Sequence, residues 1–388
     1  MIYFDNAATT RPDVSESFMK LISKEFGNPS SFHGLGLSAE RLVKSVSEKF
    51  ADYLRVKPEE IIFTSGGTES NNLAVVGSAR AYSKKGKHVI TSAAEHPSVI
   101  NAMTSLEKEG FEITRLPVND RGFVEPDSVT GALRSDTILV SLMHVNNETG
   151  SITDMESIAS KIKASGSNAL IHTDAVQGFL KERLNLADID MYSLSGHKVH
   201  AFKGVGALFA RKNVRLAPML FGGGQQRNIR PGTENTVGIM SLGLAVDGFS
   251  KIEGNADERK EKIIRIKSEL TSLTDCIDDA YINGDPNGSP FILNMSFCDV
   301  KAETLVNALS EQEIYISAGS ACNSRHPGHS SLNALSLGEN RVKSAVRFSF
   351  SYNNTYDEAV LCKEAIIKTV SALRKNQKTF RGRKNGGS

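Results

Sequence analysis

Apolar and polar positions alternate in two different ways between residues 38 and 250. Apolar side chains that recur every three or four residues predict helices at 38–54, 98–110 and 154–166. Shorter runs of β-branched and other apolar residues predict strands at 60–65, 88–93, 137–145, 169–175, 189–195 and 204–210. Strands that alternate with helices favour a mostly parallel sheet with helices on both faces, so the expected fold class is α/β.

A different pattern begins after residue 250. A charged helix is predicted at 257–273, and it is followed by predicted strands at 291–297 and 345–351 and predicted helices at 301–312 and 357–373. This alternation predicts a smaller α+β domain. We expect a large domain at 13–250 and a small domain made of 1–12 and 251–373. The small domain carries a polar segment at 317–337 that is predicted to be a mobile loop, and the basic tail at 374–388 is predicted to be disordered.

Composition and charge narrow the class of protein. Of 388 residues, 39% are hydrophobic and 23% are charged, as in a globular protein. The net charge of +2 gives no reason to expect a nucleic-acid or membrane-surface partner. The chain has no apolar run of about 20 residues and starts without a secretory pattern, so we expect a cytoplasmic protein with reduced thiols.

The four cysteines show no metal-binding spacing, and no metal site is expected. Cys298 and Cys362 stand in apolar surroundings, which predicts that both are buried as small hydrophobic side chains. Cys322 is different, because the segment SAGSACNSRHPG around it is polar and rich in glycine and serine. This pattern indicates a thiol on a loop.

The stretch FTSGGTESNN, residues 63 to 72, is a candidate phosphate site. A predicted strand ends there, two glycines follow, and a helix is expected to begin near Thr68. The first N–H groups of a helix lack internal partners and attract anions, which would place a phosphate at Gly67 and Thr68. An ordinary capped helix is an equally good explanation of this motif alone.

Two further polar residues follow predicted strands. Asp174 ends the strand at 169–175, and Lys198 comes directly after the strand at 189–195. Ligands bind at the carboxyl ends of strands in such sheets. Pyridoxal phosphate (PLP) needs an amine for its aldehyde, a carboxylate for its ring nitrogen and an anion site for its phosphate. Taken singly, Asp174 would be a turn residue and Lys198 a surface group, but together with the phosphate motif they suggest a Schiff-base lysine.

The chain resembles the cysteine desulfurases of the NifS/IscS type, which are PLP enzymes of aminotransferase fold type I. The resemblance extends over nearly the whole chain and rests on motifs that occur in order, among them YFDNAATT, FGNPSSFHGLG, FTSGGTESNN, AAEHPSV, MHVNNETG, HTDAVQ, SLSGHKVH, FGGGQQRNIRPGTEN, SAGSACNS and VRFSFSYNNT. It implies a large PLP-binding domain with a mostly parallel sheet and a smaller C-terminal α+β domain.

The resemblance also implies roles for particular residues. Lys198 would carry PLP, Asp174 would pair with the ring nitrogen, Gln177 would contact the ring hydroxyl, and His96 would stack on the ring. The phosphate would be held by Gly67, Thr68, Ser195 and His197, and by Thr233 of the other subunit of a homodimer. Asn147 would contact both cofactor and substrate, and with Arg347 it would bind the substrate carboxylate.

Cys322 would take sulfur from L-cysteine as a persulfide, and L-alanine would leave. A thiol on a Gly/Ser-rich segment can serve both a buried cofactor and an external acceptor. The expected acceptor is a protein of iron–sulfur cluster assembly or of tRNA thiolation.

Two alternative functions remain at this point. The first is another PLP enzyme of the same fold, such as an aminotransferase or a selenocysteine lyase. The second is a non-catalytic scaffold or sulfur relay. Cys322 argues against an aminotransferase, and the presence of Lys198, Asp174 and His96 beside it argues against a scaffold.

Overall fold

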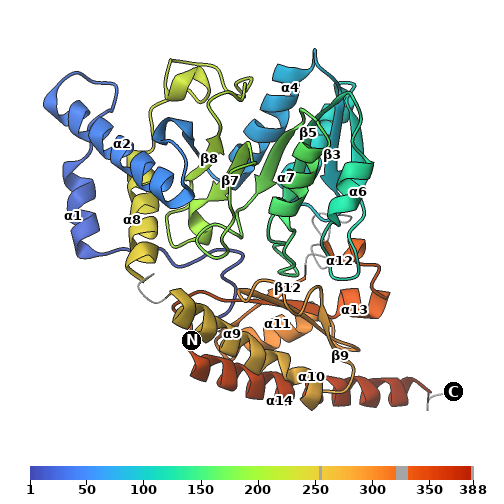
Figure 1. The fold of residues 1–388 in the computed structure, drawn as a ribbon. Helices are drawn as coiled ribbons and strands as arrows, with labels where there is room; N and C mark the ends of the chain where they lie inside the picture. Colours follow the sequence, from blue (N-terminus) through green and yellow to red (C-terminus); the bar gives the residue numbers. More distant parts are fainter. Residues whose placement is uncertain (253–255, 320–330, 386–388) are drawn as a thin grey trace.

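The computed structural model describes residues 1–252, 256–319 and 331–385, and the chain forms two lobes (Figure 1). The upper lobe is built on a large sheet and the lower lobe on a small one, with α9 and α14 beneath it. Each lobe has its own hydrophobic core: residues between Val46 and Val246 line the larger one, and residues between Ile263 and Val370 join Ile2 and Phe4 in the smaller.

Within the described residues, the large sheet has seven strands in the order β2-β8-β7-β6-β5-β3-β4. Its strands are β2 (Ile61–Thr64), β3 (His88–Ser92), β4 (Glu112–Leu116), β5 (Thr137–Met143), β6 (Leu170–Asp174), β7 (Met191–Ser195) and β8 (Gly206–Ala210). Only β8 runs against its neighbours among these strands. The carboxyl ends of β3, β5, β6 and β7 therefore meet at one edge.

Helices cover both faces of this sheet. One face packs on α2 (Gly34–Leu54), α6 (Pro126–Gly131), α7 (Met155–Ala164) and α8 (Thr236–Ile252). The other face packs on α3 (Gly67–Asn72), which continues through the π-helical turn η2 (Leu73–Gly77) into α4 (Ser78–Tyr82), and on α5 (Pro97–Lys108). Alternate residues of one strand serve the two cores, since Phe63 faces the first and Ile62 the second.

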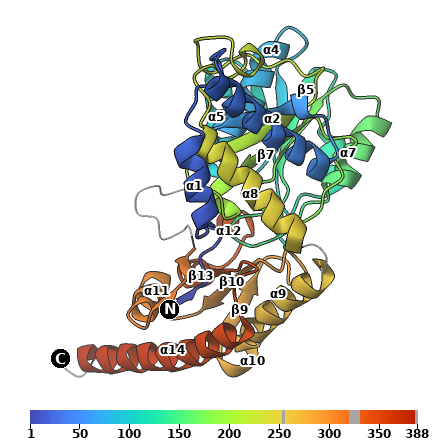
Figure 2. The ribbon, with the colours of Figure 1, turned by 90° about the vertical axis from the view of Figure 1, so that its left-hand side faces the viewer.

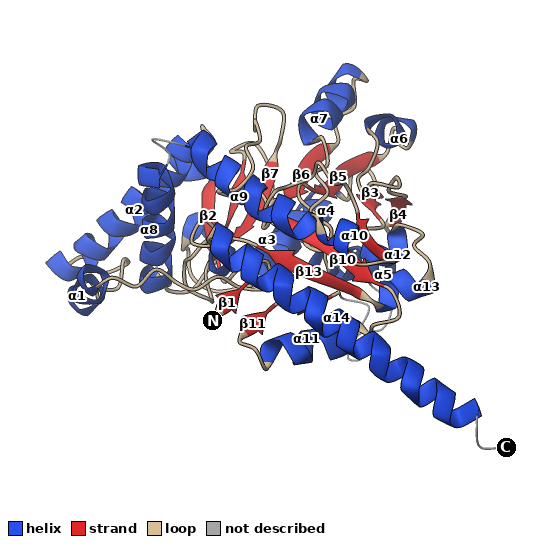
Figure 3. Cartoon of the chain, turned by 90° about the horizontal axis from the view of Figure 1, so that it is seen from below, coloured by secondary structure: helices blue, strands red, loops and turns tan. Residues whose placement is uncertain are grey.

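The small domain has a four-stranded sheet in the order β12-β13-β10-β9 among its described residues. These strands are β9 (Ala280–Asn283), β10 (Ile292–Phe297), β12 (Ser317–Ala318) and β13 (Ala345–Ser349). The long helices α9 (Ala256–Thr271) and α14 (Tyr356–Asn385) lie side by side across it, as the view from below shows (Figure 3). Near the N-terminus, β1 (Ile2–Tyr3) pairs in parallel with β11 (Ile314–Tyr315) and so joins this domain.

Shorter elements complete the chain. They are α1 (Glu16–Lys24), η1 (Pro58–Glu60), η3 (Gly196–Lys198), η4 (Gln226–Asn228), α10 (Leu273–Cys276), α11 (Ala302–Ser310), α12 (Ser331–Ala334) and α13 (Glu339–Lys343). Figure 2 shows α1, α2 and α8 together on one side of the large domain. No helix in the described part of the chain has the length and apolar character needed to cross a bilayer.

Three details differ from the pattern predicted above. Helix α8 runs two residues past the expected domain boundary at 250, and α14 continues past 373 to Asn385 instead of giving way to a disordered tail. Arg374 helps to fasten that extension, because its guanidinium donates to the backbone oxygens of Cys298 and Asp278. The segment at 317–337 is not all loop, since β12 and α12 lie within it.

The prediction for two of the cysteines is confirmed. Cys298 and Cys362 are both buried, with Cys362 in the core that α14 shares with the small sheet. Cys322 lies outside the described residues.

The packing of α14 predicts a difference between two of its side chains. Ile366 is fully buried and Leu361 is 57% exposed. Ile366→Ala should lower the free energy of unfolding by about 2–5 kcal/mol, because it leaves a cavity in the small-domain core. Leu361→Ala should change it by less than about 0.5 kcal/mol. Urea unfolding followed by circular dichroism measures both, and equal losses would contradict this packing.

Candidate active site

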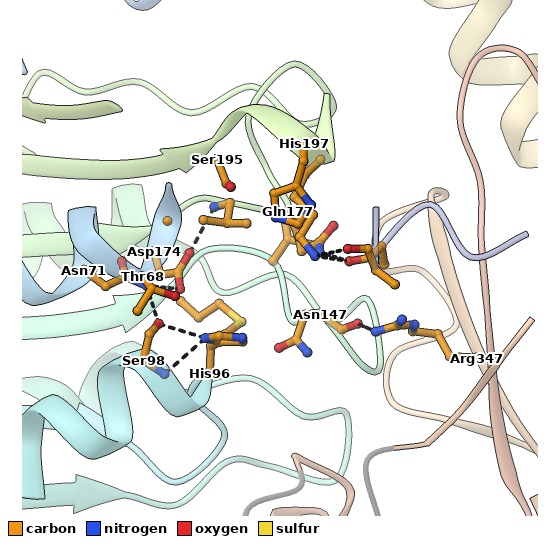
Figure 4. Close-up of a pocket in the computed structure, with 17 residues that line it drawn as sticks. Thr68, Asn71, His96, Ser98, Asn147, Asp174, Gln177, Ser195, His197 and Arg347 are labelled. Atoms are coloured by element: carbon orange, nitrogen blue, oxygen red, sulfur yellow. Dashed lines mark hydrogen bonds between the residues drawn. The ribbon is translucent and has the colours of Figure 1, made fainter. Parts of the chain in front are cut away.

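A cavity of about 350 Å³ lies at the carboxyl edge of the large sheet, where the two domains meet (Figure 4). Most of the residues singled out in the sequence line it, namely Gly67, Thr68, His96, Asn147, Asp174, Gln177, Ser195, His197, Lys198 and Arg347. All but Arg347 come from turns, strand ends or the first turn of α3 in the large domain, and Arg347 comes from β13 of the small domain. The cavity therefore depends on both domains.

The turn between β2 and α3 forms one end of the cavity. Gly66 has a φ of +151°, a conformation that favours glycine, and Gly67 opens the helix. A Cβ on Gly67 would lie 2.6 Å from Cγ2 of Val176 and 3.4 Å from Cβ of Ser195. The backbone of α3 is thus pressed close to Ser195, and the free N–H groups of its first turn point to a site suited to an anion.

Asp174 ends β6 and is held by two donors. Its Oδ2 accepts from Nδ2 of Asn71 at 2.7 Å, and its Oδ1 accepts from the backbone N–H of Val176 at 3.0 Å. The carboxylate is 4% exposed. Its buried position at the cavity wall is suited to a cationic ring nitrogen, since such a charge would compensate the buried carboxylate.

Asn71, through Ser98, also helps to set which ring nitrogen of His96 carries the proton. Nδ2 of Asn71 also donates to Oγ of Ser98 at 2.9 Å, and that hydroxyl lies 2.8 Å from Nδ1 of His96. Nδ1 accepts from the backbone N–H of Ser98 as well, at 3.1 Å, so the ring proton belongs on Nε2. Burial lowers the pKa of His96, against the opposing effect of Asp174, and favours the neutral ring.

Lys198 occupies the 3₁₀ turn η3 directly after β7. Its Nζ donates to the backbone oxygens of Ala7 and Ala8, each at 2.6 Å. Burial, with the nearby charge of Arg347, lowers the pKa of this amine to about 8. With this pKa, about one tenth of the amine is unprotonated at pH 7, and the unprotonated form is the one that acts as a nucleophile toward an aldehyde.

His197 and Gln177 lie beside the lysine. Burial and the charge of Lys198 lower the pKa of His197 to about 4, so this ring is neutral in the physiological range. Gln177 is buried, and its Nε2 donates to the same Ala7 oxygen that receives Lys198, at 2.9 Å. Both side chains therefore present neutral polar groups to the cavity.

Arg347 is clamped at the side of the cavity that faces the small domain. Its Nη1 donates to the backbone oxygen of Asn147 at 2.8 Å, and its Nη2 donates to Oδ1 of Asp5 at 3.0 Å and to Oγ of Ser317 at 3.2 Å. Its Nε is buried and has no partner. A buried guanidinium N–H without an acceptor indicates that a ligand supplies one.

The residues present fit PLP. The phosphate would meet the first turn of α3 near Gly67 and Ser195, the ring nitrogen would meet Asp174, and the aldehyde would meet Lys198. Buried polar atoms without a partner on the cavity wall, Oδ1 of Asn71 and Nε of Arg347, are left for ligand groups.

One expected site residue that the structure describes is not brought to this cavity. Thr233 is exposed in the segment before α8 and does not line the cavity of its own chain. Cys322 lies outside the described residues, although Ser317 of the neighbouring strand contacts Arg347.

Several residues that shape the site had no role in the sequence interpretation. Asn71 and Ser98 connect Asp174 with His96, Asp5 pairs with Arg347, and the Ala7 and Ala8 carbonyls receive Lys198. The motifs FTSGGTESNN and YFDNAATT contain four of these five, and AAEHPSV contains the fifth, Ser98, so the motifs themselves were the available signal.

The comparison with known proteins agrees with this site. Residues 2–360 match the family model described as aminotransferase class-V. A cysteine desulfurase IscS of Dictyoglomus turgidum is 39% identical over 381 residues, which is 96% of this chain and 95% of that protein. The cysteine desulfurase IscS of Escherichia coli O139:H28 is 38% identical over 385 residues, with coverage of 96% and 93%.

A solved structure of a NifS-like protein superposes with a TM-score of 0.88 at 34% identity, over 95% of this chain and 99% of that one. Matches of this extent and identity mean that the chain belongs to the class-V aminotransferases, a family of PLP-dependent enzymes, and within it to the cysteine desulfurases of the IscS/NifS type.

Proposed function

We propose that this cavity takes L-cysteine and that the enzyme gives L-alanine and a persulfide on Cys322. The observation that carries the proposal is that an amine, a carboxylate, a helix N-terminus and a buried guanidinium from four separate segments line one cavity. A sulfur-accepting thiol is the remaining requirement, and Cys322 supplies it.

The proposed cofactor site is made of Gly67, Thr68, Ser195, His197, Asp174, Gln177, His96, Asn147 and Lys198, with Thr233 contributed by a second copy of the chain. When bound there, PLP withdraws electrons from the amino acid attached to it and so weakens the substrate's Cβ–S bond. Asp174 favours this by holding the ring nitrogen in its cationic form.

Lys198 serves two purposes in this proposal. It is the attachment point for the cofactor, and once substrate has displaced it, its free amine takes the α-proton of L-cysteine. Burial already lowers the pKa of this amine to about 8, which leaves part of it able to accept a proton near pH 7. His96, neutral and with its proton on Nε2, packs on the cofactor and can donate that proton within the cavity.

Arg347 and Asn147 hold the substrate carboxylate. The guanidinium reaches the cavity with its Nε unpaired, while Asp5 and Ser317 hold Nη2 in place. A planar guanidinium that is already immobilised loses little entropy when it binds a carboxylate.

The thiolate of Cys322 then attacks the substrate sulfur. A sulfur–sulfur bond forms, the Cβ–S bond breaks, and the carbon fragment takes protons to become alanine. Gly319 is fixed by its N–H bond to the oxygen of Ala345 at 2.8 Å. Cys322 follows Gly319 by three positions, so their Cα atoms are at most about 11 Å apart.

We further propose a homodimer with shared sites, located in the cytoplasm, that passes sulfur to a protein of iron–sulfur cluster assembly or tRNA thiolation. Large apolar side chains are exposed in two segments of the large domain, Phe26 and Phe32 before α2 and Phe221 before η4, with exposures of 72%, 97% and 90%. Exposed phenylalanines in this number support a protein–protein interface there.

The function is tested with purified protein reconstituted with PLP. Wild type should be yellow and release alanine and sulfide in equal amounts from L-cysteine when a reductant is present. Cys322→Ala should keep the colour and lose sulfide release, and Lys198→Ala should lose both the Schiff-base absorption and turnover. Mass spectrometry should find one added sulfur on the peptide that contains Cys322. A colourless protein, or turnover that survives Cys322→Ala, contradicts the proposal.

If Arg347 binds the substrate carboxylate, replacing it should reduce the preference of the enzyme for L-cysteine over a substrate that lacks a carboxylate. Arg347→Lys removes the fork that binds a carboxylate, so kcat/KM for L-cysteine should fall about 10- to 100-fold, as expected for about 1.5–3 kcal/mol of charged hydrogen bonding. Activity with cysteamine, which lacks the carboxylate, should change little. Arg341→Lys is the matched control, because Arg341 binds Asn283 away from the cavity. Equal losses with both substrates would contradict carboxylate binding by Arg347.

The proposed dimer predicts that charge at the exposed phenylalanines disrupts assembly. Phe32→Glu together with Phe221→Glu should lower the measured mass toward that of one chain and weaken PLP binding, since Thr233 would no longer reach its partner. Leu361→Glu, an equally radical change on exposed α14, should leave the mass unchanged. Light scattering after size exclusion gives the mass. A wild-type protein that runs as a monomer would rule out the shared site.

A further inference from the structure

Lys181 lies behind the active cavity and lines a different one. This second cavity, of about 640 Å³, lies at the domain junction and is lined by both Lys181 and Lys198. Its walls include Leu180 and Phe249 of the large domain and Phe291 of the small domain. Lys198 therefore lines both cavities, whereas Lys181 lines only the second of the two.

The amine of Lys181 is joined to the active cavity through one side chain. Its Nζ donates to Oε1 of Gln177 at 3.1 Å, and Nε2 of Gln177 donates to the oxygen of Ala7 at 2.9 Å. That oxygen also receives Nζ of Lys198. An unbroken set of contacts thus runs from Lys181 through Gln177 to the carbonyl that holds the catalytic lysine.

These two neighbours decide which way the Gln177 amide points. A lysine ammonium only donates hydrogen bonds, and a peptide carbonyl only accepts them. If the amide turned over, its NH₂ group would face the ammonium and its oxygen would face the Ala7 carbonyl. Both contacts would then be repulsive, so Oε1 faces Lys181 and Nε2 faces Ala7 and the active cavity.

The consequence concerns what Gln177 offers to a ligand. Nε2 has a second N–H beyond the one given to Ala7, and Gln177 lines the active cavity. The side chain therefore presents a donor there. The phenolic oxygen of PLP, in its anionic form, is a matching acceptor.

We propose that Lys181 is a positioning residue that, through Gln177, fixes a hydrogen-bond donor against the phenolic oxygen of bound PLP. This inference rests on the proposed function, because it takes Gln177 as the neighbour of that oxygen. Lys181 itself touches neither cofactor nor substrate in this arrangement.

The charge of Lys181 and its hydrogen bond to Gln177 could each change the pKa of the Schiff base, and the two effects have to be distinguished. Burial lowers the pKa of Lys181 to about 7, and the charges of Lys198 and Arg347 act in the same direction, while Glu182 acts against them. A cation at this place also favours loss of the Schiff-base proton through space. The experiment must therefore show that the effect passes through Gln177.

The test follows the visible absorption of the PLP-loaded enzyme as the pH is raised. A donor on the phenolic oxygen stabilises its anion and so favours the deprotonated form of the linkage between PLP and Lys198. Lys181→Met should raise the midpoint of the spectral change by about one pH unit, the size expected when about one hydrogen bond is lost. Lys181→Arg, which keeps donor and charge, should stay near wild type.

Lys267→Met is the matched control. Lys267 is also buried, with a pKa lowered by burial to about 8, but its Nζ donates to the oxygen of Ser289 and does not touch Gln177. Its loss should leave the midpoint unchanged. If Lys181→Met does not fold, Lys181→Gln is measured with the same expected direction.

A double-mutant cycle decides the mechanism. In a Gln177→Leu background, Lys181→Met should cause no further shift, because the group through which it acts is gone. Additive shifts would mean that Lys181 acts through space and would overturn the proposal, as would an unchanged midpoint in Lys181→Met alone. A protein that binds no PLP would instead refute the proposed function, so the two failures are distinguishable.

Discussion

The site depends on the parallel alignment of β3, β5, β6 and β7. Because these strands run in one direction, their carboxyl ends reach the same edge of the sheet, and the residues that follow them gather there. His96 follows β3, Asn147 follows β5, and Lys198 follows β7, while Asp174 is the last residue of β6. The reversed strand β8 then packs against the turn that carries Gly66, so closely that a Cβ on Gly206 would lie 2.6 Å from Cα of Gly66.

A second constraint comes from the first residues of the chain. Tyr3 pairs with β11 and belongs to the small domain, yet the carbonyl of Ala7 receives both Lys198 and Gln177 of the large domain. Asp5, between them, pairs with Arg347. The N-terminal segment is thus fixed to both domains beside the cavity, and a displacement of one domain relative to the other would disturb Lys198 directly.

The sequence predicted much of the large domain because its central strands are buried on both faces and read as apolar runs. Two of the edge strands, β4 and β9, were not predicted. β4 contains Glu112 and Arg115 among exposed positions, and β9 is a short edge strand, so neither shows an apolar run. The extension of α14 was missed because a run of lysine and arginine has the composition of a disordered tail, while the contacts of Arg374 with the small domain depend on folding.

Many of the residues that line the cavity could also be predicted, but the contacts between them could not. Lys198 and Asp174 could be found from their positions after strands, and His96, Gln177 and Arg347 from the resemblance. The contact of Asn71 with both Asp174 and Ser98 joins residues more than 25 positions apart, and no local pattern reports it. The same holds for Lys181: the sequence shows that it stands four residues after Gln177, but not that Gln177 also contacts the Ala7 carbonyl.

The described residues on either side of the segment that contains Cys322 are held by hydrogen bonds. Gly319 is bonded to Ala345 on one side, and Ser331 accepts from Nδ2 of Asn146 at 2.9 Å on the other. A reactive group on so short a tether has an effective concentration on the order of millimolar near its target. In the proposed reaction, sulfur capture by Cys322 is then an intramolecular step with a first-order rate constant that does not depend on enzyme concentration. Delivery to the acceptor is instead bimolecular, so when the acceptor is scarce, sulfur accumulates on the enzyme.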